Sequence, residues 1–151
     1  MIFNRRTEIV QYLVTLLKQI DGDISPYDNG YQFNHNVFNN VYRKITFLDE
    51  VNDFPSIYLS AGTEIRNFQS ENLTVATLPV IIRAYVYGED NSQSQADNLV
   101  QDIEHVIYNI GSNPDMGILD ITIQNITQDE GLAFPYGIAE VELLVVYRLE
   151  Y

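Results

Sequence analysis

The sequence predicts an α+β domain in which two helices pack on one face of a largely antiparallel mixed β-sheet. Two segments repeat apolar residues at spacings of three and four, as amphipathic helices do, and several others alternate apolar with polar residues, as half-buried strands do. These segments follow the order helix, strands, helix, strands. Because 151 residues is the length of one ordinary domain, we expect residues 1–151 to form a single domain.

The first predicted helix runs from Phe3 to Ile20. Asp21-Gly22-Asp23 is expected to end it, since Gly22 can adopt the left-handed backbone that closes many helices. The following segment, Asp21 to Asn40, is rich in Asn, Asp and Gly and is interpreted as an ordered surface loop. One face of the helix carries its apolar residues: Ile9, Leu13, Leu16, Leu17 and Ile20.

Three strands are predicted in the next part of the chain. A weak pattern suggests a strand from Val37 to Phe47, whereas Ser56 to Ala61 alternates cleanly after Pro55. A short strand from Glu64 to Phe68 follows, and it leads to a polar tip at residues 69–72 that we expect to be mobile.

The longest strand is predicted from Leu73 to Tyr87. Pro79 has no N–H for a ladder hydrogen bond, so the first half of this strand is expected to lie at an edge or to carry a bulge. One face of the strand is apolar throughout: Leu78, Val80, Ile82, Ala84 and Val86.

A second helix is predicted to begin near Ser94 as N-cap and to end at Gly111. Two strands, Gly117 to Ile126 and Ile138 to Leu149, are then expected to pair antiparallel. The loop between them, Thr127 to Gly137, is long and apolar enough to be a docking element. The apolar stripe of the helix consists of Ala96, Leu99, Ile103, Val106, Ile107 and Ile110.

Acidic residues dominate the charge. The net charge is −13, from 21 Asp and Glu against 8 Lys and Arg, and no cation occurs between Arg83 and Arg148. Such a chain repels phosphates, which disfavours ordinary nucleic-acid binding, although solubility alone is an equally simple explanation. There is no cysteine and no apolar run long enough to span a membrane, so we expect neither disulfides nor a membrane anchor.

Motifs for catalysis or metal binding are not apparent. His35 and His105 lack partners and are interpreted as solvated surface residues. The carboxylates of Asp21, Asp23 and Asp28 do not have the spacing of an EF-hand loop, so neither a metal nor another cofactor is expected. No phosphate-binding Gly loop or nucleophile elbow occurs, which predicts a protein that is not an enzyme. Three acids are interpreted as the solvated face of the second helix: Asp97, Asp102 and Glu104.

Aromatic residues outside the helical stripes are numerous, and tyrosine in particular is favoured where a protein buries surface against other chains. For any single ring, filling the second face of the sheet is an equally simple reading. The set comprises Tyr27, Tyr31, Phe33, Phe38, Tyr85, Tyr87, Phe134, Tyr136 and Tyr151.

Short motifs along most of the chain resemble those of phage tail-terminator and minor tail proteins. They are DFPSIYL at residues 53–59, GTE at 62–64, LPVIIRAYV at 78–86, DIE at 102–104 and DEG at 129–131. The resemblance implies a virion structural protein, assembled in the host cytoplasm, at the head-proximal end of the tail. It further implies a ring, usually hexameric, that caps the tail tube, ends its polymerisation and joins it to the head-completion or connector protein.

The resemblance also gives the acidity a use. DNA would pass through the ring without specific binding, because a lumen lined by carboxylates repels phosphates. Four acids are candidates for the lumen: Glu89, Asp90, Asp97 and Glu104. Docking is assigned by hypothesis to two loops, Asn67 to Asn72 and Gln128 to Tyr136. In the second loop Phe134 and Tyr136 would act as anchors beside Asp129 and Glu130.

Two alternatives remain open from the sequence. A head-tail connector or head-completion protein would share the acidity and the lack of a catalytic site. An acidic inhibitor that mimics DNA would instead be a monomer with its charges in a linear array.

Overall fold

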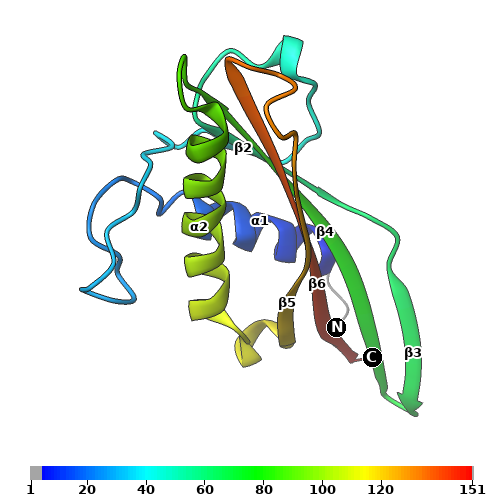
Figure 1. Ribbon diagram of the computed structural model, residues 1–151. Helices are drawn as coiled ribbons and strands as arrows, with labels where there is room; N and C mark the ends of the chain where they lie inside the picture. The colour runs from blue at the N-terminus through cyan, green and yellow to red at the C-terminus, as the bar shows by residue number, and fades with distance from the viewer. Residues whose placement is uncertain (1–4, 151) are drawn as a thin grey trace.

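Six strands form one sheet with both helices on the same side of it (Figure 1), which confirms the predicted α+β class. The computed structural model describes residues 5–150. The helices are α1 (Arg5–Leu17) and α2 (Ser92–Ile110), and two short 3-10 helices are η1 (Leu48–Glu50) and η2 (Pro114–Met116). The strands are β1 (Val41–Tyr42), β2 (Ser56–Ala61), β3 (Ile65–Ser70), β4 (Leu73–Tyr87), β5 (Ile118–Gln128) and β6 (Tyr136–Glu150).

The sheet has the strand order β1-β2-β4-β6-β5. Strands β4 and β6, each 15 residues long, pair along their whole length, from Leu73 opposite Glu150 to Tyr87 opposite Tyr136. Strand β3 continues along the same edge of β4 as β2. The pair β1–β2 is parallel and the other pairs are antiparallel, as predicted for β5 and β6.

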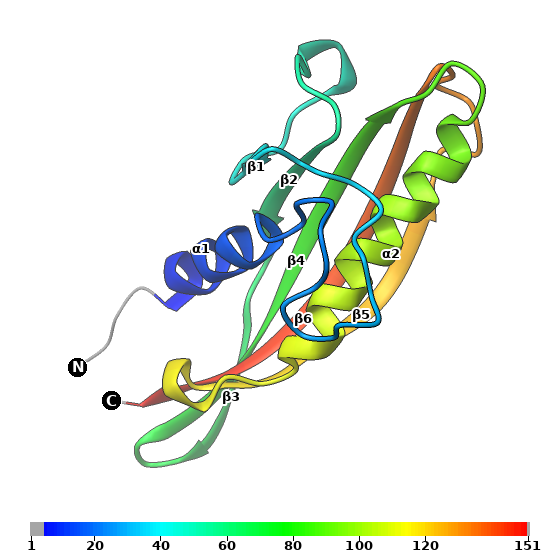
Figure 2. The same ribbon diagram turned by 90° about the vertical axis from the view of Figure 1, so that its left-hand side faces the viewer.

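The main core lies between the sheet and the two helices (Figure 2). Alternate residues of β4 and β6 point toward the helices, since successive strand residues face opposite sides. The predicted helical stripes bury nearly all their members against them. Fully buried residues of this core include Leu78, Val80 and Ile82 from β4, Val141, Leu143 and Val145 from β6, Ile9, Leu13 and Leu17 from α1, and Leu99, Ile103 and Val106 from α2.

The other face of the sheet is covered at one end by the segment between β1 and β2. Val51 from this segment packs with Tyr58 and Tyr85 in a second, smaller cluster. The Tyr85 hydroxyl also donates a hydrogen bond to the Thr46 carbonyl. The predicted strand from Val37 to Phe47 is therefore wrong except at Val41–Tyr42, because its remaining residues form turns and cross this end of the sheet.

Several boundaries differ from the predictions. Helix α1 ends at Leu17, although Ile20 is still buried, and the predicted Phe3 lies outside the described residues. Helix α2 begins at Ser92 after Asn91, so Ser94 is not its N-cap; Gly111 does follow its last residue. Strand β3 extends to Ser70, which shortens the predicted tip to residues 71–72.

Pro79 lies in an interior strand and not at an edge, with Leu144 of β6 opposite it. On its other side, β2 ends opposite Val80 and β3 begins opposite Thr77. Gly62, between β2 and β3, donates its backbone N–H to the Pro79 carbonyl (2.8 Å). In an antiparallel ladder the N and O of one residue point to the same side. The N–H that Pro79 lacks would therefore point toward the gap between β2 and β3, where no strand residue needs it as a donor.

Candidate assembly surfaces

Several of the exposed apolar side chains gather at the two ends of the sheet. We call the first the aromatic end. It lies where β4 ends and β6 begins, and Figure 1 shows the loops 88–91 and 129–135 and helix η1 there. The hairpin end, at the opposite end of the sheet, is formed by β3 and the first residues of β4. The aromatic end comprises Phe47, Phe54, Tyr87, Leu132, Phe134 and Tyr136.

The predicted docking loop, Gln128 to Tyr136, forms part of the aromatic end and is held by its own hydrogen bonds. Asp129 accepts the backbone N–H groups of Ala133 (2.9 Å) and Ile138 (3.2 Å). Glu130, which has a positive φ of 56°, accepts a hydrogen bond from the Gln93 side chain (3.0 Å). These two carboxylates therefore shape the loop.

The rings of the aromatic end are packed to different degrees. Tyr136 contacts Phe54 and Tyr87, with ring centroids 5.2 and 5.3 Å apart. Phe134 is 58% exposed and Leu132 is 93% exposed, so these two side chains form the free apolar surface of the loop. Leu132 was not singled out from the sequence, where it is one apolar residue within a loop.

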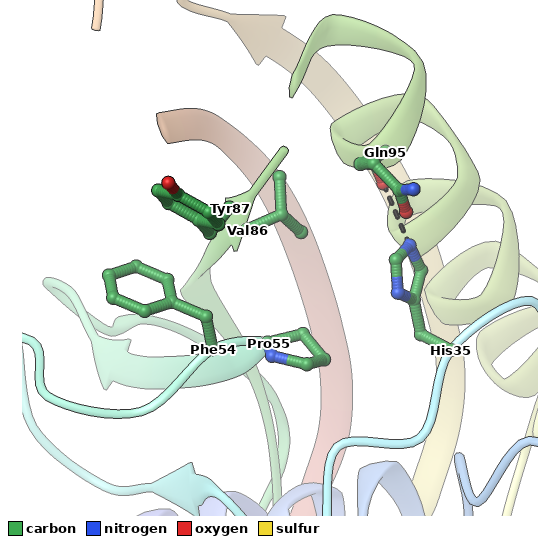
Figure 3. A pocket seen from close by; sticks show the side chains of 6 residues that line it. All are labelled: His35, Phe54, Pro55, Val86, Tyr87 and Gln95. Carbon is green, nitrogen blue, oxygen red and sulfur yellow. Dashed lines mark hydrogen bonds between the residues drawn. The ribbon is translucent and has the colours of Figure 1, made fainter. Parts of the chain in front are cut away.

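Phe134 and Gly131 line one pocket at the aromatic end together with residues 90–94, and two further pockets lie beside Phe54. The first of these two, of about 340 Å³, is lined by Phe54, Pro55, Val86 and Tyr87 on one side and by His35 and Gln95 on the other (Figure 3). The second, of about 530 Å³, is lined by Leu48, Asp49, Val51, Phe54 and Tyr136. Phe54 lines both pockets. Neither lining brings a nucleophile and a base together.

The aromatic end is acidic at its margin. Three segments reach it, residues 47–57, 86–95 and 129–138, and none of them contains a lysine or arginine. Six exposed acids lie in these segments: Asp49, Glu50, Asp53, Glu89, Asp90 and Glu130.

The four acids predicted for the lumen lie on α2 and on the loop before it. Glu89 and Asp90 are exposed in that loop, and Glu89 accepts a hydrogen bond from the Tyr87 hydroxyl (3.1 Å). Asp97 and Glu104 are two helical turns apart, and therefore lie on the same face of α2. Asp97 also accepts a hydrogen bond from Gln128 (2.6 Å).

The other predicted docking segment, Asn67 to Asn72, lies at the hairpin end. All six residues of β3 are exposed even though they pair with β4. Ile65 is 62% exposed and Phe68 is 73% exposed. The structure thus places the two predicted docking segments at opposite ends of the sheet and does not bring them together.

The remaining aromatic residues are mostly part of the chain's own packing. Phe33 and Tyr85 are buried, Tyr27 and Tyr31 are half-buried, and Phe38 is exposed. Tyr151 lies outside the described residues.

The loop from Asp21 to Asn40 packs along α2 and is attached to it by Asp102, which is fully buried. The carboxylate accepts hydrogen bonds from the Tyr31 hydroxyl (2.7 Å) and from the backbone N–H groups of Asn34 (3.0 Å) and His35 (2.9 Å). The prediction that Asp102 belongs to the solvated face of the helix is therefore wrong. Its partners come from a loop about 70 positions away, which helical spacing alone does not reveal.

The two histidines are not solvated surface residues either. The His105 ring stacks on Tyr31, with centroids 3.9 Å apart, and bonds to the Ser25 hydroxyl (2.6 Å). His35 bonds to the Gln95 carbonyl (3.0 Å). Both rings fasten the loop to α2 and neither is paired for acid-base chemistry.

Burial raises the pKa of Asp102, and the hydrogen bonds from Asn34, Tyr31 and His35 oppose this effect. A folded-state pKa above the unfolded value means that the folded protein binds more protons in this range, so stability falls as pH rises through it. We therefore expect wild type to lose stability relative to Asp102→Asn as the pH rises above about 4, the ordinary pKa of an aspartate. Urea unfolding of both proteins across this range measures the difference, and a wild type that gains stability instead would refute the raised pKa.

A family model described as Bacteriophage Tail Tube Terminator Protein matches residues 3–150 of the sequence. The chain belongs to this family. The sequence is also 31% identical to the tail tube terminator protein p142 of Escherichia phage T5, over 96% of this chain and 94% of the relative. This terminator is therefore a structural component of a phage tail, in a family that is not an enzyme class.

The fold of the terminator is found in a solved structure as well. A chain in the virion of a native gene transfer agent particle superposes with a TM-score of 0.54, covering 92% of this chain and 94% of that one. The sequence identity is 10%, so this likeness supports the shared fold alone.

Within residues 5–150 of the terminator, no three His, Asp or Glu side chains are grouped as metal ligands would be. No helix in the described part of the chain combines the length and apolar character needed to cross a membrane.

Proposed function

We propose that this terminator forms a ring on the head-proximal end of the tail tube, ends tube polymerisation and provides the surface to which the head-completion or connector protein binds. A ring that stands between two structures needs two separate docking surfaces. The observation that carries this proposal is the placement of the two apolar loop surfaces at opposite ends of one rigid sheet. Because the chain belongs to the tail tube terminator family, we take the tail tube as one of the two partners.

The sheet is well suited to keep these surfaces apart. Strands β4 and β6 run from one end to the other with 15 residues each, and at about 3.4 Å per residue they separate the ends by roughly 50 Å. Alternate residues in their central parts are fully buried under the helices. The domain can therefore hold one partner at each end with little bending.

The acids on α2 provide a passage for DNA in this proposal. Asp97 and Glu104 would face the lumen, with Glu89 and Asp90 at its margin. Carboxylates at these positions would repel the phosphates of passing DNA and so prevent it from binding. Screening over roughly 8 Å at physiological salt means that only acids close to the DNA contribute.

Removal of the protein tests the capping role. In a phage that lacks it, we expect tubes of variable and excessive length that do not join to heads, because nothing stops addition at the open end. Electron microscopy of infected-cell lysates measures tail length, with the same phage supplied with the wild-type protein as control. Tails of normal length joined to heads in its absence would exclude the capping role.

A further inference from the structure

We propose that the aromatic end is a docking site for a basic segment of another virion protein, in which lysine or arginine side chains flank an apolar one. This inference rests on the proposed function and adds the chemistry of one of the two partners. It depends on three properties of the aromatic end: its exposed apolar side chains, the hydrogen bonds that fix them, and the charge around them.

Three strongly exposed apolar side chains lie at this end of the sheet. Phe47, Leu132 and Phe134 are 67%, 93% and 58% exposed, which is costly in water. At the same end Tyr136 contacts the rings of Phe54 and Tyr87, two pockets open beside Phe54, and Phe134 lines another pocket. Exposed apolar groups next to a pocket that accepts an anchoring side chain are typical of protein-protein interfaces.

The loop that carries Leu132 and Phe134 is fixed before any partner binds. The Asp129 carboxylate accepts the backbone N–H groups of Ala133 within the loop and of Ile138 in β6, and the Gln93 side chain donates to Glu130. The Gln128 side chain also donates to the Gln93 carbonyl (3.0 Å), which attaches the loop to the first turn of α2. Because the loop is already ordered, binding would lose little conformational entropy.

Charge selects the kind of partner. Acids outnumber cations around the apolar side chains: the three segments contain no lysine or arginine, and of the two cations just before the first of them Arg43 donates to the Thr7 hydroxyl (3.4 Å) and Lys44 lies over the Tyr42 ring. A partner segment with cations would be attracted, and its cations could also lie over exposed rings such as Phe134. DNA would be repelled.

A second copy of this chain fits less well than another protein. Several of its arginines are already engaged within the chain: Arg6 donates to the Gly62 carbonyl (2.9 Å), Arg66 to Glu64 (2.6 Å), and Arg83 lies 3.8 Å from Glu140.

Matched variants at the two ends of the sheet test the inference. At the aromatic end, Leu132→Ser with Phe134→Ser removes the apolar anchors, and Asp49→Asn, Glu50→Gln and Asp53→Asn together remove three charges. The controls at the opposite end are Ile65→Ser with Phe68→Ser, and the triple variant Glu71→Gln, Asp115→Asn and Asp120→Asn. Wild type and the four variants are each measured as purified protein whose fold is checked by circular dichroism.

Binding is measured by co-sedimentation with tail tubes and, separately, with connector-bearing heads purified from the same phage. We expect both aromatic-end variants to weaken binding to the same one of these partners by about 10-fold or more, which corresponds to about 1.4 kcal/mol. Raising the salt from about 50 to about 300 mM NaCl should weaken that interaction in wild type and less so in the charge variant. The control variants should bind that partner as wild type does.

Three results would overturn the inference. If both aromatic-end variants bind both partners as tightly as wild type does, this end is not a docking site. Weakened binding in the apolar variant alone, with no effect of salt or of the charge variant, would show that the partner is not basic. Light scattering in which the aromatic-end variants lose only self-association would identify a second copy as the occupant. Tail length in the phage that lacks the protein tests the proposed function separately from all of these.

Discussion

Asp102→Ala is expected to lower the free energy of unfolding by about 3 kcal/mol, the larger of two strong effects on stability. The side chain is fully buried, and its removal leaves two backbone N–H groups, those of Asn34 and His35, without their acceptor. The Tyr31 hydroxyl loses its partner as well. For a chain of 151 residues this loss corresponds to a fall in Tm of roughly 10 °C.

The matched control is Asp97→Ala on the same helix. Asp97 is exposed and accepts one hydrogen bond, from Gln128, so its removal should cost at most about 1 kcal/mol. Urea unfolding of wild type and both variants gives the comparison. Equal, small losses for the two variants would mean that Asp102 does not attach the loop from Asp21 to Asn40 to α2.

Gly137→Ala is expected to lower the free energy of unfolding by about 2 kcal/mol through steric conflict. A Cβ atom at this buried position would lie 2.5 Å from the Ser92 carbonyl oxygen and 2.8 Å from the Val86 side chain. Because the first contact is with backbone, the first turn of α2 would have to move away from β6. The loop 129–135 would be disturbed too, since Gln93 is bonded to it.

Gly30→Ala serves as the control for this substitution. The nearest atom to a Cβ there is a carboxylate oxygen of Asp28 (3.3 Å), in an exposed turn where the side chain can shift. Thermal unfolding should show a fall in Tm of roughly 6 °C for Gly137→Ala and almost none for Gly30→Ala. A Gly137→Ala protein as stable as wild type would mean that α2 does not pack against β6 as closely as described.

Local patterns were sufficient to predict most of the regular elements. Strand β4 has the predicted bounds because alternation from Leu73 to Tyr87 reflects one buried face, which is a property of neighbouring residues. The apolar stripe of α2 could be predicted for the same reason. The predicted start of the helix is two residues too late. Ser92 packs close to Gly137, and local helix propensity carries no information about such a long-range contact.

Long-range contacts account for the main errors. The segment from Val37 to Phe47 has some apolar alternation, yet most of it crosses the sheet because Val51 and Tyr85 pack together there. Asp102 and His105 resemble ordinary polar helix residues until the loop from Asp21 to Asn40 folds onto them. Sequence spacing along a helix carries no information about a partner on a distant loop.

The candidate surfaces were partly predictable. The loop from Gln128 to Tyr136 was chosen for its apolar and acidic residues, and two of its members turn out to be engaged internally, since Asp129 shapes the loop and Tyr136 packs on Phe54. The contact of Phe54 with Tyr136 could not be predicted, because Phe54 reaches this end only when the segment 43–55 crosses the sheet.

Electron microscopy of the purified protein mixed with tail tubes tests the central claim most directly. The account predicts extra density at one end of each tube only, closed around the tube axis, and tubes that no longer elongate when more tube protein is added. A protein that leaves both ends bare, or that decorates the tubes along their length, while remaining monomeric at every concentration tested, would contradict it.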